Sequence, residues 1–282
     1  MTEINPFKWR HYKGEIILLC VRWYLRYGLS YRDLAEMMAE RGLAVDHTTI
    51  YRWVQDYAPE LEKRLKSQLK STGDSWRVDE TYIKVKGVWL YQYRAVDSED
   101  DTLDFRLSAT RDVEAATAFF EKTLGVPLTV QPRVINVDKN AAYPKAIETL
   151  KALEHLLPDC ELCQVKYLNN LIEQDPRFIK RRTRPGLGFF SFDTAQRTLS
   201  GYETMNMIRK GQAKGADKAN ILAQVSLDQH SVWISCLKFI PPDRPQHFSN
   251  TIQFLHHNQI KVIIYHIYQA FCIIMPSSLE CW

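Results

Sequence analysis

The sequence predicts an α/β protein in which an all-helical segment precedes a mixed sheet covered by helices. Three observations predict this fold class. Apolar residues recur at helical spacing through the first 70 residues, they alternate with polar residues from residue 76, and helical segments separate the strands from residue 111. A meander followed by helix-separated strands is typical of a layered α/β sheet. With 282 residues, the chain can form one large domain or two modest ones.

The first part of the chain predicts three helices, at residues 14–28, 30–42 and 46–58. Ser30 stands at the N-cap position of the second helix, with Asp33 at the capping-box position, and Gly42 ends that helix. Asp46 is the cap of the third helix. Two helices joined by a glycine-containing turn at this spacing predict a helix-turn-helix.

A helix-turn-helix uses the first turns of its second helix to reach base edges or phosphates. Those turns hold four polar residues, which we expect to contact DNA: His47, Thr48, Thr49 and Arg52. The alternative is a three-helix bundle whose polar face is merely solvated. The basic side chains of Arg22, Arg26 and Arg32 favour DNA binding over this alternative.

The remaining elements are predicted from residue 59 onwards. A charged helix at 59–74 runs into a Ser/Thr/Gly/Asp breaker, which we expect to be the linker. Then follow strands at 76–85, 88–97 and 102–110, a helix at 111–125, a strand at 133–138 and a helix at 139–153. The domains expected are a helix-turn-helix domain at 1–70, a catalytic core at 71–215 and an atypical C-terminal tail at 216–282.

Charge is segregated along the chain, although the net charge is only +4. Residues 71–170 hold 12 cationic and 16 anionic side chains, whereas residues 171–215 hold 9 and 4. A polyanion held next to a carboxylate-containing site fits this arrangement.

The six cysteines lack the density of a disulfide-stapled secreted domain. Cys160 and Cys163 have the spacing of a zinc or redox pair, but no second pair completes four ligands, so free thiols are expected. The N-terminus has no apolar signal core, and the most apolar stretch, 262–275, is shorter than a membrane span. We therefore expect a cytoplasmic protein with no membrane partner.

Two aspartates stand out by their position. Asp79 lies inside the strand at 76–85, and Asp138 lies at the carboxyl end of the apolar strand at 133–138. An ionised carboxylate in a central strand is costly unless it is paired or binds a cation. The alternative for Asp138 is that it caps the following helix; this alternative fits Asp79 poorly.

Glu173 adds a third carboxylate beside a run of cations, in the stretch "NNLIEQDPRFIKRR". Three carboxylates suit a pair of hard divalent cations that act on phosphodiesters, with two Mg²⁺ or Mn²⁺ ions expected. On a continuous helix, Lys180 lies about two turns from Glu173 on the same face and can hold a DNA phosphate. Pro176 leaves two alternatives, a kinked continuous helix or a helix that begins at Asp175 and Pro176.

These motifs resemble a known family. The stretches "WRVDETYIKVKGVWLYQYRAVDS", "VINVDKNAAYPKAI" and "VKYLNNLIEQD", with the N-terminal "SYRDLAEMMAERGLAVDHTTIYRWV", are similar to the DDE transposases of bacterial and archaeal insertion sequences, specifically insertion-sequence family six. The resemblance runs from about Phe7 to Gln212.

The resemblance implies an RNase H-like, retroviral-integrase-like core. It implies Asp79, Asp138 and Glu173 as the metal-binding triad and Lys180 as a catalytic lysine. It also implies a helix-turn-helix that recognises terminal inverted repeats, cleavage at the element ends to give a 3′-hydroxyl, attack of that hydroxyl on target DNA, and at least a dimer. The residues expected to bind DNA are His47, Thr48, Thr49, Arg52, Arg177, Lys180, Arg181 and Arg182.

Overall fold

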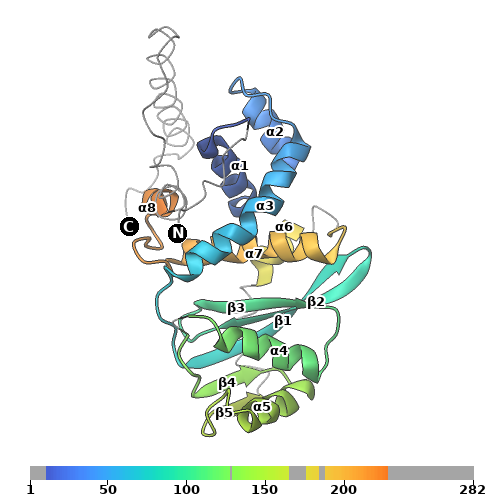
Figure 1. Ribbon diagram of the computed structural model, residues 1–282, viewed down its shortest axis with the longest axis vertical. Coiled ribbons are helices and arrows are strands. Elements are labelled where there is room, and N and C mark those ends of the chain that lie inside the picture. Colours follow the sequence, from blue (N-terminus) through green and yellow to red (C-terminus); the bar gives the residue numbers. More distant parts are fainter. Residues whose placement is uncertain (1–10, 128, 165–175, 184–187, 228–282) are drawn as a thin grey trace, which may run out of the picture. The chain divides into compact units, whose positions relative to one another are not determined.

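The computed structural model describes residues 11–127, 129–164, 176–183 and 188–227 (Figure 1). All of them lie within residues 1–238, which form one compact unit. The described elements are three N-terminal helices, a five-stranded sheet, and helices that pack on both faces of the sheet.

The N-terminal helices are α1 (Gly14–Arg26), α2 (Tyr31–Ala39) and α3 (His47–Lys66). The predicted capping box is confirmed, because the Asp33 N–H donates to Ser30 Oγ and the Ser30 N–H donates to the Asp33 carboxylate. Asp46 caps α3 by accepting from the Thr48 N–H at 2.8 Å. Helix α3 packs against both α1 and α2, as expected of a helix-turn-helix.

Helix α3 is longer than predicted. The charged helix expected to begin at residue 59 is instead the C-terminal half of α3, which continues through Pro59 to Lys66. A proline inside a helix costs about 3 kcal/mol. Burial of Ala58, Leu61 and Leu65, each at most 2% exposed, offsets this cost and keeps the helix continuous.

The sheet has the strand order β3-β2-β1-β4-β5. Its strands are β1 (Ser75–Val85), β2 (Val88–Val96), β3 (Thr102–Ser108), β4 (Val134–Val137) and β5 (Glu161–Gln164). The first three form the predicted antiparallel meander, and β4 and β5 are parallel to β1. Lys86 and Gly87 both have positive φ in the β1–β2 turn, as a tight hairpin requires.

Helices α4 (Val113–Leu124) and α5 (Ala142–Ala152) cover one face of the sheet. Their apolar side chains form a core with alternate residues of β1, β2 and β4, including Trp76, Tyr93 and Val137. Helix α5 begins at Ala142, so Pro144 lies in its first turn, where a missing N–H is tolerated. Both helices were predicted from the sequence.

The other face of the sheet is covered by α6 (Pro176–Thr183) and α7 (Phe192–Lys210), and α8 (Ile221–Ser226) follows. A second core joins α1, α2, α3 and α7 to the opposite side chains of β1 and β2, including Ile83 and Leu90. Strand β5 and helices α7 and α8 were not predicted. In the described part of the chain, no helix combines the length and apolar character needed to cross a membrane.

Helix α7 packs closely on the N-terminal helices at Gly201. A Cβ atom added to Gly201 would lie 2.6 Å from Leu25 Cδ2 in α1 and 2.8 Å from Ala58 Cβ in α3. Gln55 of α3 also donates to the buried Thr198 hydroxyl of α7 at 2.8 Å. The absence of a side chain at Gly201 therefore fixes how α7 joins the N-terminal helices to the sheet.

Candidate active site

Two of the predicted carboxylates lie on neighbouring interior strands of the sheet, where the carboxyl end of β4 meets the middle of β1. Strands β1 and β4 are parallel, and their register pairs Ser75 with Val134 and Arg77 with Asn136. Two positions further along, Asp79 of β1 stands beside Asp138, which directly follows β4. Neighbouring strands are about 4.8 Å apart, so the two side chains can share a cation.

The side chain of Asp79 is half-buried on the face of the sheet that α6 and α7 cover. Burial raises the pKa of its carboxyl above the usual value, against the N–H of Glu80 and the charge of Lys180, which lower it. The negative charges of Glu80 and Asp138 raise this pKa further. The exposed Lys180 of α6 thus acts on Asp79 electrostatically.

Asp138 is held by two different contacts. Its Oδ1 accepts from the Asn140 N–H at 2.9 Å, and its Oδ2 accepts from Arg111 Nη2 at 2.7 Å. The first contact is an Asx-type turn. The N-cap residue of α5 is Ala141, without a side-chain cap bond, so the alternative that Asp138 caps this helix is wrong. The side chain remains 43% exposed, which leaves it accessible to a ligand.

Glu80, which follows Asp79 in β1, is a third carboxylate of this site, and the sequence analysis missed it. It points to the face that α4 and α5 cover, its side chain is only 6% exposed, and it forms an ion pair with Arg111. Tyr143 of α5 donates to Glu80 Oε1 at 2.6 Å. The stretch "VDET" places two acids in succession in a strand, so one must face each side of the sheet; that alternation was the available signal.

Arg111 connects the two carboxylates. Burial by itself would lower the pKa of Arg111, but Glu80 and Asp138 raise it above the ordinary value. The guanidinium therefore stays charged and links the buried Glu80 to the accessible Asp138.

The third predicted metal ligand, Glu173, lies outside the described residues, and so does the predicted partner of Pro176, Asp175. Within the ranges that the structure describes, no three His, Cys, Asp or Glu side chains group closely enough to hold a metal ion. Cys160 directly precedes β5 and Cys163 lies in it, and neither forms a disulfide.

The predicted DNA-contacting residues of the helix-turn-helix all lie on the first turns of α3. Thr48 and Arg52 are exposed, and His47 and Thr49 are partly exposed. The Thr48 hydroxyl donates to Asp46 Oδ1 at 2.5 Å, so it also stabilises the start of the helix. Burial of Ile50, Trp53 and Val54 on the opposite face directs the polar face outwards.

The predicted basic residues of α6 are divided between two surroundings. The charge of Lys180 acts on Asp79, whereas Arg182 donates to the backbone carbonyl groups of Leu25 and Arg26 at the end of α1. Arg182 also lies over the Tyr202 ring, 5.3 Å from its centroid, and thus has a packing role besides any role with DNA. Arg181 is exposed, and the side chain of Arg177 lies outside the described residues.

Comparison with known proteins identifies relatives of this chain. The family model described as DDE domain matches residues 73–212. The transposase for insertion sequence-like element IS431mec of Staphylococcus aureus is 43% identical over 208 residues, which cover 73% of this chain and 90% of that protein. The transposase for insertion sequence element IS257 in transposon Tn4003, also of Staphylococcus aureus, is 42% identical over 208 residues, which again cover 73% of this chain and 90% of that protein.

Among solved structures, the HTLV-2 integrase catalytic core domain in complex with magnesium is similar, at 16% identity and a TM-score of 0.34. The match covers 46% of this chain and 86% of that one. A divalent metal ion is the cofactor typical of the DDE family. The long match to the staphylococcal proteins and the match to the DDE domain show that the chain belongs to the DDE transposases of insertion sequences, family six, and is a DNA transposase with a catalytic core built on a mixed sheet.

Proposed function

We propose that this transposase cuts and joins DNA at a site built from Asp79, Asp138 and Glu173. The observation that carries the proposal is the parallel pairing of β1 with β4, which brings Asp79 next to Asp138 at the carboxyl end of β4. Lys180 of α6 supports it, because its charge acts on Asp79. Glu173 enters through the family resemblance and completes the set.

The donor set fits hard divalent cations. Carboxylate oxygens are the ligands that Mg²⁺ and Mn²⁺ prefer. Asp138 is accessible, and its negative charge acts on Asp79, a repulsion that a shared cation would relieve. We propose that Asp79, Asp138 and Glu173 hold two such ions. When bound, the ions would activate the attacking oxygen and stabilise the charge on the leaving oxygen.

The basic side chains of α6 would position the DNA strand. Lys180 would hold a phosphate next to the scissile one, and Arg177, Arg181 and Arg182 would hold the strand further along. In cleavage, a water oxygen bonds to phosphorus, the bond to the 3′ oxygen breaks, and that oxygen leaves with a proton as a 3′-hydroxyl. In transfer, this hydroxyl forms a new phosphodiester bond with target DNA, and the target strand is released at its own 3′ oxygen.

The N-terminal helices would supply recognition of the element ends. Residues 1–70 would form the DNA-binding domain, in which His47, Thr48, Thr49 and Arg52 read the terminal inverted repeats. Residues 71–215 would form the catalytic core, and residues 216–282 a tail. Because two element ends must be brought together, the active species would be at least a dimer.

Strand transfer in solution tests the proposal. The purified chain is incubated with a labelled duplex that carries the inverted repeat flanking its gene, with target plasmid, and with Mg²⁺ or Mn²⁺. We expect a labelled joint product that is lost with EDTA and in the Asp79→Ala variant. Asp74→Ala is the matched control, because Asp74 is an exposed acid near the opposite end of β1.

Each outcome of this assay has a definite meaning. Joint product from Asp79→Ala equal to that of the unchanged chain would exclude Asp79 from the site. Cleavage without joining would instead identify a nuclease with the same core, and binding of the repeat without cleavage would identify a DNA-binding regulator.

A further inference from the structure

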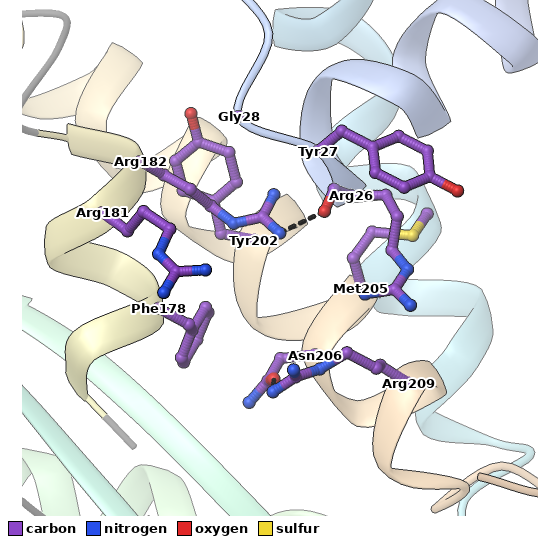
Figure 2. Close-up of a pocket in the computed structure, with 10 residues that line it drawn as sticks. All are labelled: Arg26, Tyr27, Gly28, Phe178, Arg181, Arg182, Tyr202, Met205, Asn206 and Arg209. Carbon is purple, nitrogen blue, oxygen red and sulfur yellow. Dashed lines mark hydrogen bonds between the residues drawn. The ribbon is translucent and has the colours of Figure 1, made fainter. Parts of the chain in front are cut away.

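A basic cavity lies between α1, α6 and α7, away from the carboxylates. Its volume is about 400 Å³, which is within the range of ligand pockets, about 300–1,000 Å³. Four arginines line it from three helices: Arg26 of α1, Arg181 and Arg182 of α6, and Arg209 of α7 (Figure 2). The remaining lining residues are Tyr27, Gly28, Phe178, Tyr202, Met205 and Asn206.

The ten lining residues, all in the described part of the chain, include no acid to balance these four cations. The arginines oppose one another: burial, together with the charges of Arg26 and Arg209, lowers the pKa of Arg182 to about 10. Burial likewise lowers the pKa of Arg26, and Arg209 adds to this effect. Like charges gathered in one cavity destabilise the free protein, so this cluster has a cost that a bound anion would remove.

Only part of the donor capacity of the cluster is used within the protein. Arg182 is held by the carbonyl groups of Leu25 and Arg26, one of which Figure 2 marks, and Arg209 donates one bond to Asn206 Oδ1 at 2.8 Å. Each guanidinium has five N–H donors in a fixed fork. Arg181 and Arg209 are exposed, so their remaining donors face a ligand that enters from solvent.

We propose that this arginine pocket binds a backbone phosphate of the DNA on which the transposase acts. Guanidinium groups bind phosphate oxygens in a bidentate manner, and four of them from three helices surround one anion from several sides. The inference rests on the proposed function, since it takes the DNA of that reaction as the ligand. It assigns Arg26 and Arg209, which the sequence did not single out, to DNA binding together with Arg181 and Arg182.

The position of the pocket relative to the carboxylates supports DNA as the source of the phosphate. Lys180 acts on Asp79, and the next two residues of α6, Arg181 and Arg182, line the pocket. Helix α6 has eight residues and is about 12 Å long, so a DNA strand bound near Lys180 has further phosphates within reach of the arginines on the same helix. Because α1 supplies Arg26, the same strand would join the N-terminal helices to the catalytic core.

The salt dependence of DNA binding tests this inference. Fluorescence anisotropy of a labelled duplex of arbitrary sequence is measured over a series of KCl concentrations for the full chain and for the double variant Arg181→Gln/Arg209→Gln. We expect roughly tenfold weaker binding, and a slope of log K against log salt that is smaller by about 0.9, because one phosphate contact is lost.

Arg133→Gln is the matched control. Arg133 is an arginine 69% exposed, and it precedes β4 at the end opposite Asp138. The control should keep the affinity and the slope of the unchanged chain. Equal losses in the control and in the double variant would overturn the inference, since total charge would then explain them.

Thermal unfolding separates ligand binding from a structural role. We expect the double variant to unfold at the same or a higher temperature, because removing two cations relieves repulsion; a lower Tm would mean that the arginines serve packing. Sodium phosphate is then compared with sodium chloride at equal ionic strength. A phosphate-specific rise in Tm that needs Arg181 and Arg209, with unchanged DNA affinity in the variant, would identify a free-phosphate site and overturn the assignment to DNA.

The Asp79→Ala variant keeps this test separate from that of the proposed function. It should bind the duplex with unchanged affinity and slope while it forms no joint product. Failure of the pocket inference appears in affinity and slope, whereas failure of the catalytic proposal appears in strand transfer alone.

Discussion

Arg111 Nη2 lies 2.7 Å from Asp138 Oδ2. The same guanidinium forms an ion pair with the buried Glu80, so Arg111 joins a carboxylate inside the core to an accessible carboxylate at the carboxyl end of β4. A cation that binds at Asp138 therefore meets a side chain whose orientation is already fixed from the other face of the sheet. This relationship, and the adjacency of Asp79, lead to the first predictions.

We expect Arg111→Gln to lower the free energy of unfolding by about 2–3 kcal/mol, because Glu80 would be left buried without its cation. The double variant Glu80→Gln/Arg111→Gln should recover much of this loss, since no uncompensated charge remains. Urea denaturation of the four proteins forms a double-mutant cycle. Additive effects of the two substitutions would show that the ion pair has no part in stability.

Asp79→Asn should raise the Tm of the metal-free protein. Burial raises the pKa of Asp79 in the folded state above the value of about 3.9 in the unfolded chain, so ionisation opposes folding. The penalty is absent below pH 4, grows as the pH rises to the folded pKa, and is complete above it. The gain in Tm should therefore be largest at neutral pH and vanish below pH 4.

Addition of Mg²⁺ or Mn²⁺ should raise the Tm of the unchanged chain but not of Asp79→Asn, because a cation that binds only the folded protein stabilises it. Differential scanning fluorimetry over a metal titration provides the measurement, with Asp74→Asn as control. A metal-dependent shift that survives in Asp79→Asn would place the cation elsewhere.

Gly201→Ala should lower stability, although alanine is the better helix former. The added methyl group would meet Leu25 and Ala58, both fully buried, at less than normal contact distance. Overpacking costs about 1–3 kcal/mol, against about 1 kcal/mol gained in helix propensity. Chemical denaturation gives the balance, and Gly201→Ser, which adds a larger group, should cost more. An unchanged or raised stability would mean that α7 can move away from α1 and α3.

Arg52→Gln should reduce the preference for inverted-repeat DNA over random duplex by about 1–3 kcal/mol, since Arg52 is exposed on the first turns of α3. Competition binding with both duplexes measures the preference. Lys63→Gln, an exposed cation in the last turn of the same helix, should leave it unchanged. A loss that affects both duplexes equally would restrict Arg52 to phosphate contact.

Local sequence patterns determined much of the secondary structure of this protein and the identity of its candidate site residues. Features that depend on residues close in sequence could be predicted. They are the capping box of Ser30 and Asp33, the meander of β1 to β3, and the placement of Asp79 in a strand and of Asp138 directly after one. Helix α7 was not readable, because it buries Thr198, Ser200 and Glu203 along with its apolar residues and so shows no apolar stripe. Glu203 finds its partners in a distant element, since Gln92 and Arg94 of β2 both donate to its carboxylate.

The tertiary structure alone decided which groups meet. Asp79 and Asp138 become neighbours through the parallel pairing of β1 and β4, strands almost 60 residues apart, and no local periodicity specifies that register. The arginine pocket likewise collects Arg26 and Arg209 from opposite ends of the described chain. The sequence by itself determined which chemistry the protein carries, because residue type and strand position are local; the packing of the sheet and helices decided where that chemistry converges, because burial and pairing act between segments far apart along the chain.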